Sequence, residues 1–150
     1  LARVHPPKYI EYLESVQPSV GTYRVDTDTA MNSGTLDAAR HAAGAVVKAV
    51  DMVMNGQAPN AFCAIRPPGH HAETRKAMGF CFFNNIAIGA MHAIAEHGIE
   101  RVAILDFDVH HGNGTEEIFK NDDRVMLLSL FQHPFFRNRA NLTFELNNKN

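Results

Sequence analysis

Two aspartates and a histidine at alternating positions, Asp106, Asp108 and His110, form the strongest candidate for metal chemistry in this sequence. Side chains alternate between the two faces of an extended chain, so these three residues are expected on one side. Carboxylate oxygen and imidazole nitrogen suit zinc or another borderline divalent metal that keeps a position open for water. Such a metal lowers the pKa of its water to about 7 and polarises a carbonyl group. The spacing therefore predicts a metal site.

Two histidine doublets, at 70–71 and 110–111, belong to the same prediction. Each follows an apolar run, residues 61–65 and residues 101–106, that is expected to form a buried parallel strand. Ligands of open α/β sheets bind beyond the carboxyl ends of such strands, so neighbouring strands would bring both doublets to one crevice. For any single Asp or His in these loops, a structural role in capping the turn is as well supported as a role in chemistry. The combination in two strand-end loops favours a functional site.

The elements that would position these residues follow a strand–helix–strand order. Helices are expected at 1–16, 35–54, 84–97 and 115–119, strands at 61–65, 101–106 and 124–130, and a loop at 17–33. Thr35 is the expected N-cap of the second helix, and Gly56 and Gly98 are placed to end the second and third helices. This order is typical of an α/β fold with a parallel sheet and right-handed crossovers.

The composition limits the classes of function. The chain has 150 residues, 45% apolar and 20% charged, which is typical of one globular domain. Its net charge is −2 without a Lys/Arg cluster, so direct nucleic-acid binding is not expected. No apolar run is long enough to predict a membrane span. Two cysteines without Cys-x-x-Cys spacing favour a reducing compartment, expected to be the cytoplasm, or the nucleus in a eukaryote.

Three ordered blocks carry a specific family resemblance. They read Arg-Pro-Pro-Gly-His-His-Ala at 66–72, Gly-Phe-Cys-Phe-Phe-Asn-Asn at 79–85 and Asp-Phe-Asp-Val-His-His-Gly-Asn-Gly-Thr at 106–115. The blocks resemble consecutive signatures of the histone deacetylase superfamily, in the form of its class II and bacterial amidohydrolase branch, to which acetylpolyamine amidohydrolases are related. The resemblance covers residues 4–136, the N-terminal half of that family's catalytic domain. It implies the arginase/deacetylase fold, a parallel sheet flanked by helices, here incomplete.

The resemblance also implies two ion sites. Asp108 and His110 match two of the three zinc ligands of a deacetylase that acts on acetylated lysine or polyamine amines. A monovalent-cation site, for K⁺, is implied at Asp106, Asp108, His110, Ser129 and Leu130. A hydroxyl at a strand end is otherwise ordinary, so Ser129 by itself does not decide this point.

Catalysis is assigned by the same resemblance to His70 and His71. The family orients the first imidazole with a buried aspartate, here Asp106, and the second with the residue that matches Asn113. An ionised aspartate stabilises an imidazolium, whereas a neutral asparagine orients an imidazole without charging it. His71 is therefore expected to be the base that takes a proton from water and later gives it to the leaving amine, and His70 to hold the oxyanion and the water.

Aromatic side chains are expected to hold the substrate. Phe80, beside Gly79, resembles one wall of the slot that grips an acyl-lysine chain, and Phe136 is assigned to the opposite wall. Apolar walls suit an alkyl stem. Phe82 and Phe83 are expected to pack in the core instead.

Four other side chains are expected to take no part in the chemistry. Asp26 and Asp28 lie in the loop with which the family holds the substrate backbone, but a solvated loop aspartate is the favoured interpretation. His92 and His97 have no matching partner at metal-ligand spacing and are expected at the surface or at a helix end.

The third zinc ligand of the family, an aspartate, and its oxyanion-stabilising tyrosine lie downstream of the matched region. The expected division is a partial deacetylase-like catalytic domain at 1–136 and a divergent polar tail at 137–150. Two hypotheses stay open: a zinc-dependent deacetylase, and a catalytically inactive fragment of that fold with a binding or association role. The 150 residues alone are expected to be inactive, and to self-associate as a homo-oligomer through apolar surface around 125–130.

Overall fold

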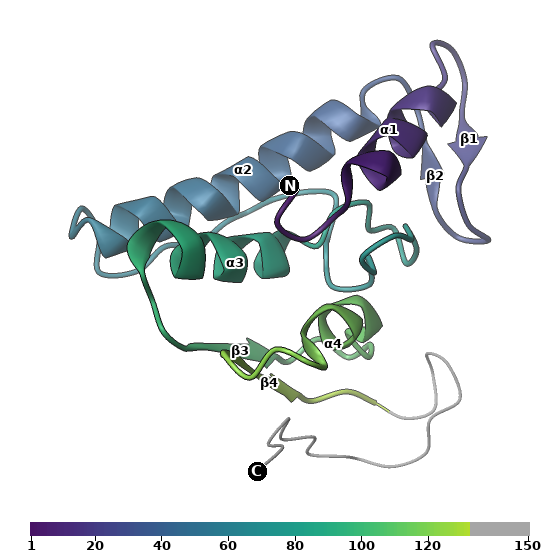
Figure 1. Ribbon diagram of the computed structural model, residues 1–150. Coiled ribbons are helices and arrows are strands. Elements are labelled where there is room, and N and C mark those ends of the chain that lie inside the picture. Colours follow the sequence, from purple (N-terminus) through teal and green to yellow (C-terminus); the bar gives the residue numbers. More distant parts are fainter. Residues whose placement is uncertain (133–150) are drawn as a thin grey trace.

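A computed structural model gives the arrangement of the chain and describes residues 1–132 (Figure 1). Its elements, in chain order, are α1 (Pro7–Val16), β1 (Tyr23–Arg24), β2 (Ala30–Met31), α2 (Thr35–Met54), α3 (Asn85–His97), β3 (Val102–Asp106), α4 (Asn113–Phe119) and β4 (Val125–Ser129). All the predicted helices are present, whereas the loop expected at 17–33 contains the short antiparallel pair β1–β2. The tail at 137–150, and the domain boundary expected before it, lie outside the described residues.

Strands β3 and β4 form a parallel two-stranded sheet, as the strand–helix–strand order predicted. The crossover between them contains α4, and α3 and α4 lie on the same side of the two strands (Figure 1). Ile104 pairs with Leu127, and both side chains are buried. The same register places Asp106 opposite Ser129 at the carboxyl ends of the strands. The sheet therefore brings two polar side chains together at the edge from which the doublet at 110–111 emerges.

The expectation of exposed apolar surface on β4 is confirmed only for alternate residues. Met126 and Leu130 are exposed, but Val125 and Leu127 are buried. Side chains of a strand point alternately to its two faces, so one set packs against the helices and the other does not. On β3, Leu105 belongs to the exposed set.

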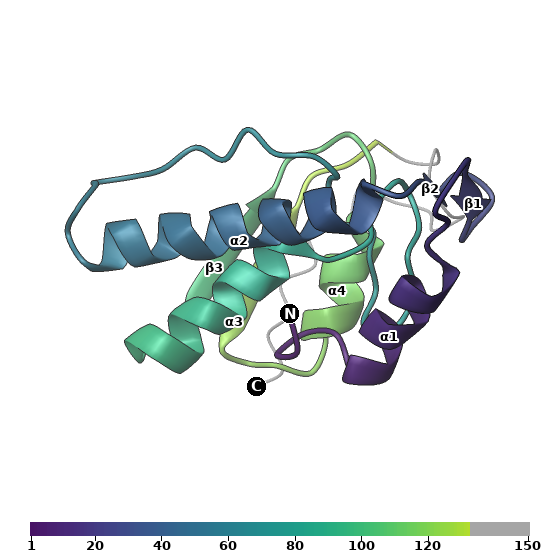
Figure 2. The same cartoon turned by 90° about the horizontal axis from the view of Figure 1, so that it is seen from above.

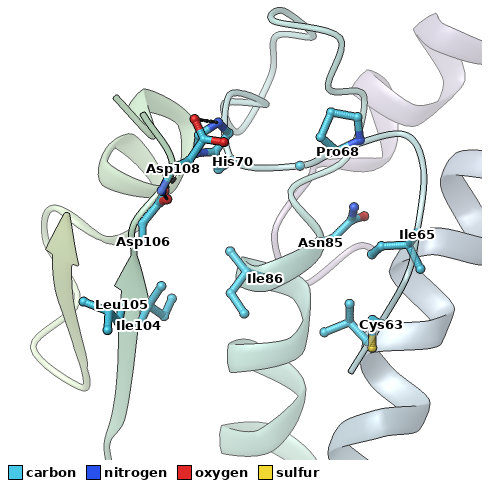
Figure 3. A pocket seen from close by; sticks show the side chains of 12 residues that line it. Cys63, Ile65, Pro68, His70, Asn85, Ile86, Ile104, Leu105, Asp106 and Asp108 are labelled. Carbon is cyan, nitrogen blue, oxygen red and sulfur yellow. Dashed lines mark hydrogen bonds and ion pairs between the residues drawn. The ribbon is translucent and has the colours of Figure 1, made fainter. Parts of the chain in front are cut away.

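The strand expected at 61–65 is not formed, and this segment pairs with no other strand in the part of the chain that the structure describes. It runs back beside α2 (Figure 2), where the Cys63 thiol donates to the Ala45 carbonyl oxygen at 3.7 Å. Figure 3 shows Ile86 of α3 between this segment and β3. Residues of the segment, of α3 and of β3 line a cavity of about 390 Å³. A strand needs a hydrogen-bonded neighbour, which an apolar composition does not supply.

The helices end where the sequence predicts, but α1 begins at Pro7 instead of residue 1 and α4 at Asn113 instead of residue 115. The N-cap of α2 also differs from the prediction. Gly34, not Thr35, is the N-cap, and the Thr35 hydroxyl instead accepts the backbone N–H of Asn32 at 2.9 Å. Gly56 (φ +70°) and Gly98 (φ +65°) adopt the left-handed conformation after α2 and α3, as predicted. No helix within residues 1–132 is long and apolar enough to cross a membrane.

A fully buried histidine fastens the N-terminal segment to the start of α3. His5 donates through Nδ1 to the Thr74 carbonyl oxygen at 3.2 Å and accepts the Asn84 backbone N–H through Nε2 at 2.9 Å. Its ring packs near Tyr9 and Phe83, with centroids 5.3 and 5.6 Å away. Burial lowers the pKa of His5 to about 4, so the side chain is neutral at physiological pH. No pattern in the sequence indicated this structural role.

Candidate active site

His70 is joined to the end of β3 by a charge-assisted hydrogen bond. Its Nδ1 lies 2.9 Å from Asp106 Oδ2, and both side chains are largely buried. An ionised carboxylate only accepts hydrogen bonds, so Nδ1 carries the donated proton. The other ring nitrogen, Nε2, lies 3.9 Å from Asp108 Oδ1 (Figure 3). The structure thus contains the His70–Asp106 hydrogen bond that the family resemblance implied.

His71 has a neutral partner instead. Its Nδ1 lies 2.9 Å from Asn113 Oδ1, in the first turn of α4. Two other contacts orient the Asn113 amide, because its Nδ2 donates to Glu73 Oε1 at 3.0 Å and to Met78 Sδ at 3.2 Å. The amide therefore presents its oxygen to His71, so that Nδ1 carries the proton and Nε2 the lone pair. No pattern in the sequence pointed to Glu73 or Met78.

The two imidazoles lie close together in unlike surroundings. Their ring centroids are 4.0 Å apart. Burial lowers the pKa of His71 to about 4, and the neighbouring His70 ring acts in the same direction. His71, only 5% exposed, is therefore neutral at physiological pH, which is the state that a base must have before it takes up a proton.

Asp108 and His110 lie at the mouth of the site, each with about half of its side chain exposed. Asp108 Oδ1 accepts the His110 backbone N–H at 2.7 Å and lies 3.0 Å from His110 Nδ1. Burial acts to raise the pKa of Asp108, but the hydrogen bonds from His110 and the nearby His70 imidazole outweigh it and hold that pKa below its usual value. An anionic carboxylate oxygen beside an imidazole nitrogen is a donor pair that fits zinc. Within residues 1–132, no third His, Cys, Asp or Glu completes a ligand cluster with them.

Backbone and amide contacts bring the three sequence blocks together. The His70 carbonyl oxygen accepts the N–H groups of Gly114 and Thr115 at 2.9 and 3.1 Å. A Cβ on Gly114 would lie 2.3 Å from the Ala72 carbonyl oxygen, so this approach requires glycine. The buried Asn84 side chain donates to the Ala72 carbonyl and the Thr115 hydroxyl, both at 3.1 Å. Residues of all three blocks therefore contribute to the same small network.

Phe80 is held at the rim in a left-handed backbone conformation, with φ +66°. Its N–H donates to the Thr29 hydroxyl at 3.0 Å, and the N–H of Gly79 donates to Asp28 Oδ1 at 3.1 Å. Asp28 is exposed in its loop, as predicted, but its carboxylate also holds the turn before Phe80 through the Gly79 N–H. Hydrogen bonds from the Thr29 hydroxyl and from Gly79 hold the pKa of Asp28 below its usual value. The β1–β2 loop thus positions the residue expected to form one wall of the slot.

The other aromatic predictions divide in two. Phe80 is 63% exposed and accessible to a ligand, whereas Phe82 and Phe83 are buried in the core, as predicted. Phe136, assigned to the opposite wall, lies outside the described residues. The Asp26 carboxylate lies 3.9 Å from Lys76 Nζ and accepts the Thr27 backbone N–H at 2.9 Å.

A buried hydroxyl beside Asp106 is unsatisfied. Ser129 Oγ makes no hydrogen bond in the described part of the chain. The adjacent Leu130 N–H donates to the Asp106 carbonyl oxygen at 2.8 Å, which holds the ends of β3 and β4 together. A buried hydroxyl without a partner is unfavourable, and a cation bound through its oxygen would satisfy it. The position of Ser129 therefore fits the monovalent-cation site that the resemblance implied.

His97 is the last residue of α3, at a helix end as predicted, whereas His92 is buried and both histidines have a carboxylate partner that the sequence did not indicate. Both Nε2 atoms reach the same carboxylate oxygen of Asp51 on α2. Asp51 is 41 and 46 positions away along the chain, so the partnership depends on the packing of two helices and has no local signal.

The sequence also matches a known family. Residues 1–143 match the family described as "Histone deacetylase domain". The "Histone deacetylase-like amidohydrolase" of Pseudomonas aeruginosa is 46% identical over 136 residues, which is 91% of this chain and 36% of that protein. The "Probable deacetylase" of Archaeoglobus fulgidus is 45% identical over 133 residues, 89% of this chain and 36% of that protein.

A solved structure shares the fold. The crystal structure of the HDA15 HD domain superposes with a TM-score of 0.82 and 40% sequence identity, covering 87% of this chain and 36% of that one. The α/β fold with a parallel sheet is therefore confirmed. The chain spans about a third of the length of these relatives.

Proposed function

Because the chain belongs to the histone deacetylase family, we propose that it carries the histidine part of a zinc-dependent amidohydrolase site that removes acetyl groups from acylated lysine or polyamine amines. The observation that carries this proposal is the unequal histidine pair, in which His70 contacts a carboxylate and His71 an amide oxygen. Amide hydrolysis needs a base for the attacking water and an acid for the leaving amine. Two adjacent imidazoles in unlike surroundings are suited to these tasks.

Asp108 and His110 would hold the zinc ion. When bound, zinc polarises a carbonyl oxygen and makes water more acidic at neutral pH. The lowered pKa of Asp108 keeps its carboxylate anionic, as a ligand must be. Catalytic zinc sites use three protein ligands, so the proposal requires one more from outside residues 1–132.

The proton transfers follow from the two hydrogen bonds to Nδ1. His71 Nε2 accepts a proton from water as the water oxygen attacks the amide carbon, while its Nδ1–H continues to donate to Asn113 Oδ1. His71 then donates this proton to the amine nitrogen as the C–N bond breaks, which leaves acetate and a free amine. The Asp106 carboxylate stabilises His70 as an imidazolium, and the charge of His70 holds the developing oxyanion.

The substrate slot is proposed at Phe80 and Gly79, with Phe136 as its opposite wall. The exposed ring of Phe80 offers an apolar surface for the alkyl stem of lysine or a polyamine. Its fixed backbone supports this role, because Asp28 and Thr29 hold both N–H groups of the turn.

A structural K⁺ ion is proposed next to the zinc site. Its ligands would come from Asp106, Asp108, His110, Ser129 and Leu130. The unsatisfied Ser129 hydroxyl supports this assignment, and the β3–β4 register places it beside Asp106. Such an ion would hold the carboxyl ends of the two strands in fixed positions.

The second candidate function is binding without turnover, which the half-exposed pair of only two zinc ligands within residues 1–132 favours. The test uses the full-length protein, stripped of metal and then given zinc until all of its zinc sites are saturated. Release of free amine is measured from an acetyl-lysine peptide and from an acetylated diamine. Turnover restored by zinc supports the proposal. Absence of turnover on both substrates at full zinc occupancy contradicts it and supports the binding role.

A further inference from the structure

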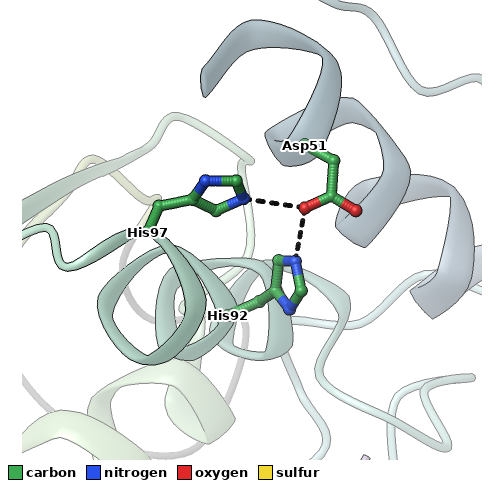
Figure 4. Close-up of side chains that lie close together, drawn as sticks. All are labelled: Asp51, His92 and His97. Carbon is green, nitrogen blue, oxygen red and sulfur yellow. Dashed lines mark hydrogen bonds and ion pairs between the residues drawn. The ribbon is translucent and has the colours of Figure 1, made fainter. Parts of the chain in front are cut away.

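A second histidine–carboxylate cluster lies at the ends of α2 and α3 (Figure 4). Asp51 is in the last turn of α2, and His92 and His97 are in the second half of α3. Asp51 Oδ1 lies 2.7 Å from His92 Nε2 and 2.8 Å from His97 Nε2, and one ligand atom from each residue lies within 4.8 Å of the others. The two imidazoles are mostly buried and the carboxylate is about one-third exposed.

We propose that Asp51, His92 and His97 bind a divalent first-row metal ion, Zn²⁺ in the first instance, that links α2 to α3. Two imidazole nitrogens and one carboxylate oxygen are ligands that zinc takes readily, with a fourth position left for water. At metal–ligand bonds of about 2.0–2.1 Å, tetrahedral donors are about 3.3 Å apart. The two His–Asp separations are about half an ångström shorter, as is usual for N–H···O hydrogen bonds. Small side-chain rotations would lengthen both Nε2–Oδ1 distances by this amount.

The orientation of the rings favours convergence on one ion. The His92 and His97 rings are nearly perpendicular, at 73°, with centroids 5.7 Å apart, and both direct Nε2 at the same oxygen (Figure 4). The hydrogen bonds from His97 and then His92 hold the pKa of Asp51 below its usual value, so the carboxylate is anionic. A metal ion would replace the two N–H protons that now lie between these atoms.

The electrostatic surroundings contain one opposing and one favourable feature. Arg3 NH1 lies 3.4 Å from His92 Nδ1, and the Arg3 guanidinium is also ion-paired with Glu96. Metal binding through Nε2 moves the His92 proton to Nδ1, so Arg3 must give up this contact and keep Glu96 alone. The favourable feature is the C-terminal end of each helix, where the partial negative charge of the carbonyl groups attracts cations. His97 is the last residue of α3.

The cluster is separate from the candidate active site. The first residue of α3, Asn85, donates through its side chain to the Pro67 carbonyl oxygen, in the loop that leads to His70. At 1.5 Å per residue, His92 and His97 lie about 10 and 18 Å further along the helix axis. An ion there would therefore act on how the helices pack and would leave the candidate catalytic residues unchanged.

The test counts metal ions and measures their effect on stability. The full-length protein is dialysed against Zn²⁺. The zinc content per chain and the melting temperature are then measured for the wild type, Asp51→Asn and His97→Gln. Each variant is expected to hold one equivalent less than the wild type and to lose the stabilisation by zinc that comes from this site. His41→Gln is the matched control, since His41 is an exposed histidine of α2 whose Nδ1 lies 2.8 Å from the Asp37 carbonyl oxygen of the same helix. Arg3→Gln is expected to bind zinc more tightly.

Two further measurements separate this ion from the proposed catalytic one. Asp108→Asn is expected to keep the ion of the cluster, so failure of the proposed function would leave this result standing. In the wild type, the ring resonances of His92 and His97 are followed by NMR during zinc titration, which does not depend on the folding of any variant. The proposal is overturned if the wild type and both cluster variants have equal zinc content, or if the His92 and His97 resonances are unchanged at saturation. Either result would show that the cluster joins the helices by hydrogen bonds and binds no metal.

Discussion

The two histidine pairs of this chain differ in how their partners are distributed. His70 and His71 each contact a different group, one a carboxylate and the other an amide. His92 and His97 share one oxygen of Asp51. Separate partners make the first two imidazoles unequal, which suits proton transfer, whereas a shared oxygen directs the second two at one point, which suits ligation of one ion. The partner of each ring nitrogen, more than adjacency in sequence, therefore indicates what a histidine pair can do.

The strongest test of this distinction removes the proposed ligands of the active-site zinc. Asp108→Ala and His110→Ala each delete one donor atom, so either variant of the full-length protein should lose the active-site zinc and all measurable hydrolysis. The ion of the Asp51 cluster should remain, because its ligands are untouched. Elemental analysis of dialysed protein checks both statements. Retention of the active-site equivalent in both variants would show that the ligand assignment is wrong.

Replacement of the proposed base is expected to give the next largest effect. His71→Ala should lower the turnover of an acetylated substrate by about 10²-fold or more while zinc stays bound, as is usual for a positioned acid–base group. Steady-state kinetics and zinc content are measured together, with His41→Ala as a control on an exposed helix surface. Unchanged turnover in His71→Ala would move the base to another residue.

A third kind of histidine, held by backbone groups alone, sharpens the comparison through stability. The pKa of His5 is about 4 in the folded protein, below the ordinary value of about 6.5 in the unfolded chain. The unfolded state therefore binds a proton first as the pH falls. His5 stabilises the fold fully above pH 6.5, and this contribution, about 3 kcal/mol, is lost between pH 6.5 and pH 4. His71 acts in the same direction.

Urea unfolding at pH 7.5 and pH 4.5 measures this loss. His5→Gln should be less stable than the wild type at pH 7.5 and should lose less stability on acidification. An identical loss in the wild type and His5→Gln would assign the acid sensitivity to other groups.

The smallest effects are expected from two glycines, one near each histidine pair. Gly79 (φ +57°) and Gly98 (φ +65°) are both left-handed, but a Cβ at Gly79 would lie 2.3 Å from His71 Cδ2, whereas at Gly98 nothing lies within 4 Å. Gly98→Ala should cost about 1 kcal/mol through backbone strain alone, and Gly79→Ala about 2–3 kcal/mol with reduced activity. Thermal unfolding compares them. Equal losses of stability in the two variants would mean that the His71 ring moves away from the new Cβ at no cost.

Features with local signals could be predicted from the sequence. The helices, the parallel β3–β4 pair and the loops that carry both histidine doublets follow from apolar periodicity, helix-ending glycines and strand-end aspartates. The strand predicted at 61–65 is not formed because a strand needs a hydrogen-bonded partner, which an apolar sequence does not reveal; the Phe62 side chain of this segment is 93% exposed. Asp51 was missed because its contacts with His92 and His97 depend on how two helices are rotated against each other. Glu73 and Met78 were missed because they act on His71 only through Asn113.

The hydrogen bonds that join the segment 70–74 to the segment 106–117 have a consequence for how the site forms and opens. The contacts of His70, His71, Glu73 and Thr74 with the second segment span 36 to 43 residues of chain. Closing a loop of this size costs about 3 kcal/mol of chain entropy, but only once, because the first contact brings the others within reach. They are therefore gained and lost together. The amide protons of Gly114 and Thr115, both bonded to the His70 carbonyl, should exchange with solvent at matching rates whenever this unit opens.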